Sequence, residues 1–150
     1  MLVVDQDIYV LDIGQDQIVR YRLDETRSNV PDQAGAIVLK QGQNVEGINV
    51  GPLIDIAWQA PIPGVMDKAN LLVLDGNNSV FRYNQRVDGA ALQTFGDQAN
   101  WQTPTQIQTY VGRFYVADGE RGQIYRYTPG AYDQPPQPWL LVPQASTVSS

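Results

Sequence analysis

The chain has 150 residues, with ten Lys and Arg against sixteen Asp and Glu, and a formal net charge of −6 at pH 7. This length allows a sizeable core within one domain, and the acidic balance argues against a nucleic-acid partner, because phosphate binding needs a basic face. Cys and His are both absent, so no disulfide framework is expected and the commonest general base and metal ligand is missing.

Short strands and turns, rather than helices, are expected along the whole chain. Thirteen Gly and ten Pro punctuate it, and no window shows the sustained three- and four-residue apolar spacing of a helix, which predicts an all-β fold. The expected strands are residues 2–4, 8–11, 17–23, 36–40, 53–58, 71–74, 80–83, 92–95, 106–111, 114–117, 123–127 and 139–142. The polar tail, residues 144–150, is expected to fray.

One phrase occurs three times. Two strand-like runs flank a short turn, and the first run ends in Asp while the second ends in Arg-Tyr. The copies cover residues 7–21, 70–83 and 113–127, with the acids Asp12, Asp75 and Asp118 and the cations Arg20, Arg82 and Arg126. These copies, each within four short strands, predict three antiparallel units, approximately 1–48, 52–102 and 104–143, of a single segment that spans residues 1–150.

The repeated phrase resembles the NHL-type β-propeller repeat, in which a strand, an Asp-rich turn, a run such as Tyr-Val-Ala-Asp and a final Arg-Tyr follow one another. Residues 2–21 carry this pattern in the first unit, and residues 115–118 with 123–127 carry it in the third. The second unit departs from it in the loop 59–70 and in a turn that is one residue shorter.

A looser resemblance concerns the phrasing of residues 127–130 and 135–138, which is similar to propeller regions attached to bacterial serine/threonine kinases and phosphatases. Together the resemblances imply three four-stranded antiparallel propeller blades, half of a six-bladed β-propeller. A half-ring leaves an open blade face at each end. Completion of the ring by self-association, or by further blades of a longer chain, is therefore implied as well.

The repeated acids and cations each have two interpretations. Asp12, Asp75 and Asp118 precede turns, where Asp more often bonds nearby backbone amides, although a ring of acidic ligands is the alternative. Arg20, Arg82 and Arg126 are expected to pack between blades, and a basic recognition ring is the alternative. If the turns of the first and third copies match, Arg20 lies opposite Tyr9 and Arg126 opposite Tyr115, which suits stacking of a guanidinium on a ring.

Asp55 is the best candidate for a polar site in a central channel, with Glu46 and Asn49 before it. Lactonase-type propellers bind a divalent metal with carboxylates and Asn at the channel mouth. The expected first strand of the third unit offers Gln106, Gln108 and Thr109, which are poor metal ligands. No metal or other cofactor is therefore expected.

Two classes of function remain. The first is a non-enzymatic binding or scaffold module that presents the loops 24–35, 60–69 and 132–138 to a protein, peptide or glycan. The second is a metal-dependent lactonase or hydrolase, against which the missing His and the sparse carboxylates count. The first is the prediction, and no catalytic residue is assigned.

The sequence does not specify a cellular compartment. No apolar run approaches the ~20 residues that span a bilayer, and residues 1–6 lack a basic region followed by an apolar segment. Neither membrane insertion nor a signal peptide is expected, although a parent chain could be extracytoplasmic.

Overall fold

The computed structural model describes residues 1–4, 6–22, 35–64, 69–86, 89–95, 101–120, 122–128 and 137–138. These residues are all-β, and every strand pairing among them is antiparallel. The predicted all-β class is therefore confirmed. In this part of the chain no helix is long and apolar enough to cross a membrane.

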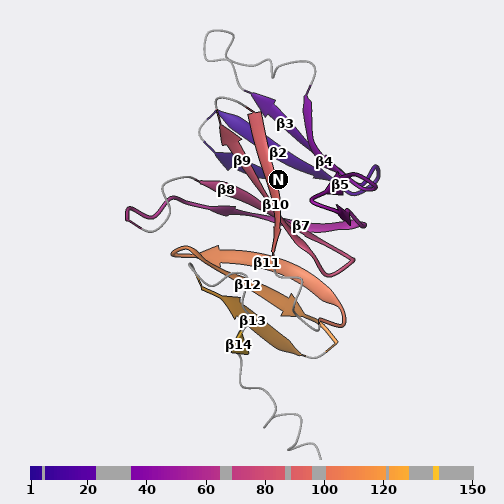
Figure 1. Cartoon of the computed structure of the whole chain (residues 1–150), viewed down its shortest axis with the longest axis vertical. Coiled ribbons are helices and arrows are strands. Elements are labelled where there is room, and N and C mark those ends of the chain that lie inside the picture. Colours follow the sequence, from indigo (N-terminus) through magenta and orange to yellow (C-terminus); the bar gives the residue numbers. More distant parts are fainter. Residues whose placement is uncertain are drawn as a thin grey trace, which may run out of the picture.

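Three four-stranded sheets contain twelve of the described strands, and in each sheet the strands are neighbours in chain order. The first sheet contains β1 (Leu2–Val4), β2 (Asp7–Asp12), β3 (Gln17–Arg22) and β4 (Ala36–Lys40). The second contains β7 (Leu53–Gln59), β8 (Asn70–Asp75), β9 (Val80–Arg86) and β10 (Gly89–Phe95). The third contains β11 (Pro104–Tyr110), β12 (Arg113–Asp118), β13 (Gln123–Tyr127) and β14 (Gln137–Pro138). The sheets follow one another along the long axis of the molecule, with the second in the middle (Figure 1).

The strands differ from the expected ones in two places. A small hairpin of β5 (Asn44–Val45) and β6 (Ile48–Asn49) was not predicted. Its turn residues Glu46 and Gly47 have φ angles of 53° and 86°, the left-handed pair of a type I′ turn. The strand expected at 139–142 and the tail 144–150 lie outside the described residues. Gln137 and Pro138, which were expected in the loop 132–138, form β14 and pair with β13.

Each sheet has two faces, because successive side chains of a strand point to opposite sides. We call one the forward face: Tyr9, Leu11, Ile18 and Arg20 in the first sheet, Leu72, Leu74, Val80 and Arg82 in the second, and Tyr115, Ala117, Ile124 and Arg126 in the third. We call the other the reverse face: Ile8, Val10, Val19 and Tyr21, then Leu71, Val73, Phe81 and Tyr83, then Phe114, Val116, Tyr125 and Tyr127. The pairs of Tyr9 with Arg20 and of Tyr115 with Arg126 confirm the predicted register.

The core consists of two clusters that repeat one kind of contact. In the first cluster the forward face of the first sheet packs on the reverse face of the second, and in the second cluster the forward face of the second sheet packs on the reverse face of the third. The strand β8 is covered on both sides, and four of its residues are 0% exposed: Leu71, Leu72, Val73 and Leu74. Full burial stabilises the fold by about 1.5–3 kcal/mol for each such side chain. The stack therefore has a direction, from forward face to reverse face.

Aromatic rings lie in both contacts between sheets. Tyr9 lies 5.8 Å from the ring of Trp58 and 6.4 Å from that of Tyr83, measured between ring centroids. In the third sheet Tyr127 stacks on Phe114 at 4.3 Å and meets Trp101 edge-on at 6.0 Å. Such pairs add about 0.5–1.5 kcal/mol each beyond the area that they bury.

Candidate functional site

The turn after the second strand of each sheet begins at one of the repeated Asp residues. Asp75 accepts the N–H groups of Asn77 at 3.1 Å and Ser79 at 2.9 Å within its own turn. It also accepts the N–H of Gly51 at 2.7 Å, which belongs to the segment that leads into β7. Burial raises the pKa of Asp75, and these hydrogen bonds from the backbone oppose the rise.

Asp118 makes a related connection in the third sheet. Its carboxylate accepts the N–H groups of Gln102 at 2.7 Å and Thr103 at 3.1 Å, just before β11. The N–H of Gly119 donates to the carbonyl of Thr103 at 2.9 Å. In the second sheet Gly76 donates in the same way to Pro52, at 2.7 Å. Both Asp-Gly turns thus hold the segment that leads into their own sheet.

Asp12 differs from these two. It accepts the N–H of Gln15 at 3.2 Å, in an exposed turn where Ile13 follows in place of Gly. The neighbouring Asp16 accepts the N–H of Leu53 at 3.3 Å and so connects this turn to the start of β7. The three repeated Asp residues are therefore not equivalent: Asp75 and Asp118 are buried and accept several backbone N–H groups, whereas Asp12 lies in an exposed turn and accepts that of Gln15.

Asp55 lies between the second and third sheets. One carboxylate oxygen accepts the N–H of Ile56 at 2.9 Å, and the other accepts the N–H of Ile107, in β11, at 2.9 Å. Asn49, expected near it, accepts from the side chain of Asn44 across the β5–β6 hairpin at 3.1 Å, and Glu46 lies in the turn of that hairpin. In the described part of the chain no three acidic side chains gather in a way that could hold a metal ion.

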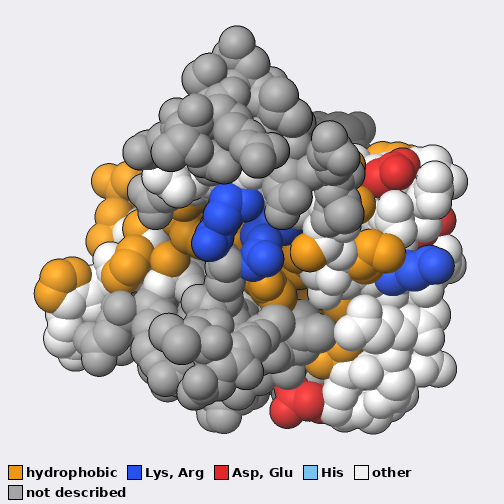
Figure 2. All heavy atoms as spheres, turned by 90° about the horizontal axis from the view of Figure 1, so that it is seen from above, with side chains coloured by type: hydrophobic (Ala, Val, Ile, Leu, Met, Phe, Trp, Pro, Cys, Tyr) orange, Lys and Arg blue, Asp and Glu red, His pale blue; other side chains and the backbone are white. Residues whose placement is uncertain are grey.

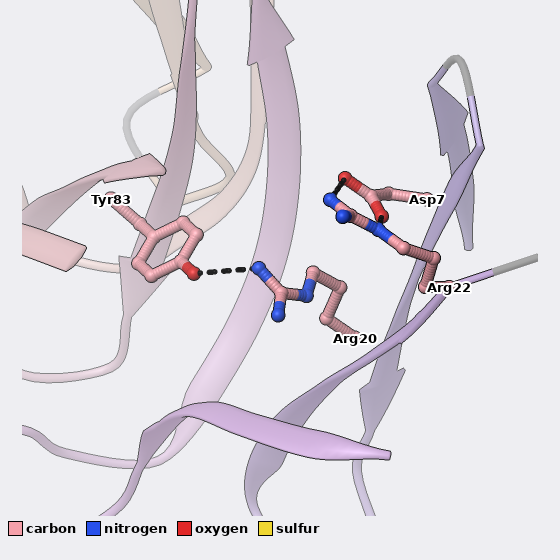
Figure 3. A network of polar contacts seen from close by, with 4 residues as sticks. All are labelled: Asp7, Arg20, Arg22 and Tyr83. Carbon is pink, nitrogen blue, oxygen red and sulfur yellow. Dashed lines mark hydrogen bonds and ion pairs between the residues drawn. The ribbon is translucent and has the colours of Figure 1, made fainter. Parts of the chain in front are cut away.

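The three repeated arginines all lie on forward faces. Nη1 of Arg20 donates to the hydroxyl of Tyr83 at 3.3 Å, across the contact of the first and second sheets (Figure 3). Arg22 forms an ion pair with Asp7 of its own sheet, with Nε and Oδ1 3.0 Å apart (Figure 3). The other two repeated arginines are placed by the strand register alone. Arg82 stands opposite Leu72 in β8 and Gln93 in β10, and Arg126 stands opposite Tyr115 in β12 and Gln137 in β14.

The forward face of the third sheet carries a hollow of about 320 Å³. Its lining residues are Gln106, Gln108, Tyr110, Tyr115, Ala117 and Ile124. The phenol rings and aliphatic groups make the exposed lining mostly apolar, and none of the lining residues is charged. Sequence reasoning considered the two glutamines only as poor metal ligands and missed the hollow. The sequence pattern that could have indicated it is the polar–apolar alternation of β11, in which Gln106 and Gln108 are exposed and Ile107 between them is buried.

The two ends of the strands form two different edges of the stack. We call the edge that carries the Asp turns the turn edge. There the side chain of Asn78 donates to the carbonyl of Trp101 at 3.1 Å and so connects the second sheet to the segment before β11. The other, the loop edge, carries the connections after the first and third strands of each sheet, because the strands are antiparallel neighbours in chain order. The three loops of the sequence prediction fall in such connections, β3–β4, β7–β8 and β13–β14, although the last two residues of the loop 132–138 form β14. Most of their residues, 24–34, 65–68 and 132–136, lie outside the described ones.

The β11–β12 turn is the best described part of the loop edge. Val111 and Gly112 have φ angles of 49° and 77°, and Tyr110 and Val111 are 66% and 65% exposed. Nε2 of Gln59 donates to the carbonyl of Gly112 at 2.9 Å, and Oε1 of Gln59 accepts from Asn70 at 3.0 Å. The backbone of this turn is thus held to the second sheet while its apolar tip faces solvent.

No protein-family model matches the chain, and a search of curated proteins finds no match either.

Proposed function

We propose that the chain is a three-bladed segment of an NHL-type β-propeller and acts as a non-enzymatic binding or scaffold module for a protein, peptide or glycan. The architecture that supports this is the stack of three antiparallel four-stranded sheets with one repeated contact between successive sheets. The repeated Asp turns and forward-face arginines support it as well, because they recur at equivalent positions.

The exposed tip of the β11–β12 turn is the observation that carries the binding function. A β-branched residue at a positive φ is unfavourable by about 1–2 kcal/mol relative to ordinary geometry, and such strain is concentrated at functional sites. Val111 has this geometry, is largely exposed and follows an exposed Tyr110. Tyr is among the residues that anchor protein recognition. The tip therefore offers a rigid apolar contact at the edge to which the long loops belong.

The chemistry of the other polar groups favours binding over catalysis. Both carboxylate oxygens of Asp55 accept backbone N–H groups of packed strands, which supports a structural role for this residue. The hollow on the third sheet is lined by amides, rings and aliphatic groups. None of these lining residues is charged, so the hollow supplies no carboxylate or amine as a general base.

A screen followed by matched variants tests the proposal. The wild-type chain is screened against a displayed library of random linear peptides and against a glycan array, and the best ligand is then titrated into each variant. We expect Val111→Asn and Pro63→Ser, both at the loop edge, to weaken binding at least tenfold, since apolar contacts are lost while Asn tolerates the left-handed geometry. The control Ile13→Asn, at the turn edge, should bind as the wild type does. Absence of any ligand, or an equal loss in the control, contradicts the proposal.

A further inference from the structure

We infer that the forward face of the third sheet is a docking surface for the reverse face of the first sheet of a second copy of this chain. Copies would then associate head to tail. The inference rests on the direction of the stack, which is also part of the proposed function, and it does not depend on any ligand of the loop edge. The chain itself contains the template for this contact, because its first and second sheets meet through the same pair of faces.

The forward face of the third sheet repeats that of the first, position by position. The aromatic residue is Tyr115 where the first sheet has Tyr9, and both stand opposite an Arg in the next strand. The next pair is Ala117 with Ile124 in the third sheet and Leu11 with Ile18 in the first. The aromatic, aliphatic and cationic groups thus recur in the same arrangement. In the first sheet they pack on another sheet, so the same face in the third sheet has a known kind of occupant.

The reverse face of the first sheet has the composition of the matching, covered face of the second. Its Ile8, Val10, Val19 and Tyr21 correspond to Leu71, Val73, Phe81 and Tyr83, which are between 0% and 7% exposed. On the same reverse face Val3 and Ile37 are 61% and 57% exposed, opposite Ile8 and Val19 respectively. Figure 2 is seen from above the stack and shows hydrophobic side chains at the surface, interspersed with Lys or Arg side chains and with residues that the structure does not describe. Exposed large apolar side chains on a face of this composition favour an interaction site.

Two specific contacts can be carried over from the internal template. Arg20 donates to the hydroxyl of Tyr83 (Figure 3), and Tyr21 holds the position of Tyr83 in the first sheet. Arg126, which holds the position of Arg20, is therefore placed to donate to Tyr21 of the second copy. The second contact is that of Trp58. Trp58 stands opposite Leu71 in the second sheet and Val3 stands opposite Ile8 in the first, so Val3 holds the position of Trp58.

The hollow fits the same arrangement. In the template the ring of Trp58 lies against Tyr9, so in the docked pair Val3 would approach Tyr115. Ala117 is smaller than Leu11, its counterpart, and it lines the hollow beside Tyr115. The hollow therefore has room for an apolar side chain of the other copy, such as Val3. A contact between different faces of two identical chains either closes into a ring or continues as an open chain.

Two variants, each with a charge introduced into one of the two proposed faces, and one control test this contact. We call the two the blocked variants. Ala117→Glu places a charge on the forward face of the third sheet, and Val3→Glu places one on the reverse face of the first. Ile13→Glu, at the turn edge, is the control, because Ile13 is 58% exposed and the change of charge is the same. Each protein is first shown by circular dichroism and urea unfolding to fold as the wild type does. If Ala117→Glu does not fold, the exposed pair Gln106→Glu/Gln108→Glu replaces it.

Sedimentation velocity over a range of micromolar concentrations gives the outcome. We expect the wild type and Ile13→Glu to sediment as dimers or larger species, and each blocked variant alone to sediment as a monomer. An equal mixture of the two blocked variants should form a one-to-one dimer and nothing larger, because one intact forward face and one intact reverse face remain. A monomeric wild type, a blocked variant that self-associates, or a mixture that stays monomeric overturns the inference. A failed ligand screen leaves these outcomes unchanged, so the two proposals fail separately.

Discussion

Replacing Asp75 with Ala removes the carboxylate that holds the Asp-Gly turn of the second sheet. Its oxygens accept the N–H groups of Gly51, Asn77 and Ser79 at 2.7, 3.1 and 2.9 Å, and the side chain is 0% exposed. The bonds from Gly51 and Ser79 are buried, so water does not readily replace the lost acceptor there. The bond from Asn77 is only partly buried, and water can satisfy that donor.

The magnitude follows from the two buried donors. A buried donor left without its acceptor costs about 1–3 kcal/mol, so the two together cost roughly 2–6 kcal/mol. The desolvation of the carboxylate offsets part of this loss, because burial raises the pKa of Asp75 and the charged form is unfavourable in the fold. We expect a net loss of about 2–4 kcal/mol, above the ~0.5–2 kcal/mol that is typical of capping side chains.

Urea unfolding measures the effect, with Asp12→Ala as the control. Asp12 holds the equivalent position, loses the same charge and accepts one N–H, that of Gln15, in an exposed turn, so its loss should stay below about 1 kcal/mol. Asp75→Asn keeps one acceptor oxygen but turns an amide donor toward a backbone N–H, and it should lose less than the Ala variant. It also serves if Asp75→Ala does not fold. The reasoning is refuted if Asp75→Ala loses no more stability than Asp12→Ala.

Three further predictions test other parts of the structure. Burial raises the pKa of Tyr9 from 10.0 to about 12, so its contribution to stability is complete below pH 10 and is lost as the pH rises toward 12. Tyr9→Phe should therefore flatten the decline of the urea midpoint across that window, whereas Tyr110→Phe, at an exposed position, should not. A double-mutant cycle of Arg20→Met with Tyr83→Phe should give a coupling of about 0.5–1.5 kcal/mol, and zero coupling contradicts the hydrogen bond of 3.3 Å between them. Val111→Asn should raise the free energy of unfolding by about 1 kcal/mol through relief of its positive φ, and a lower urea midpoint contradicts that geometry.

Most of the fold could be predicted because its information is local. Each hairpin joins runs that are near in sequence, and the aromatic and β-branched residues of a run such as Phe114–Ala117 favour a strand by themselves. Matched turn lengths also gave the pairing of Arg20 with Tyr9. The β5–β6 hairpin escaped prediction because each of its strands has two residues, too few for a period to show. Glu46 in its turn is not a residue that commonly signals a positive φ.

The candidate site could be predicted much less, because it depends on how the sheets stack. Asp75 was expected to bond its own turn, but its bond to Gly51 joins residues 24 positions apart. Asp55 reaches Ile107 over 52 positions, and no pattern within one strand specifies that partner. Arg20 was assigned to packing between blades, yet nothing in the sequence pointed to Tyr83 as its acceptor. Residue types identified the groups that bond, whereas the stacking of the sheets decided their partners.

The composition of the strands bears on what covers the two ends of the stack. In the middle sheet Leu71–Leu74 is apolar at every position, and both of its faces are buried, as expected for a strand that lacks a solvent side. The corresponding run of the first sheet, Ile8-Tyr9-Val10-Leu11, is equally apolar at every position, and so is Phe114-Tyr115-Val116-Ala117 of the third. A strand with one face in water usually alternates between apolar and polar residues instead. Since the end sheets have the composition of a sheet covered on both sides, their second faces are better suited to another sheet than to solvent.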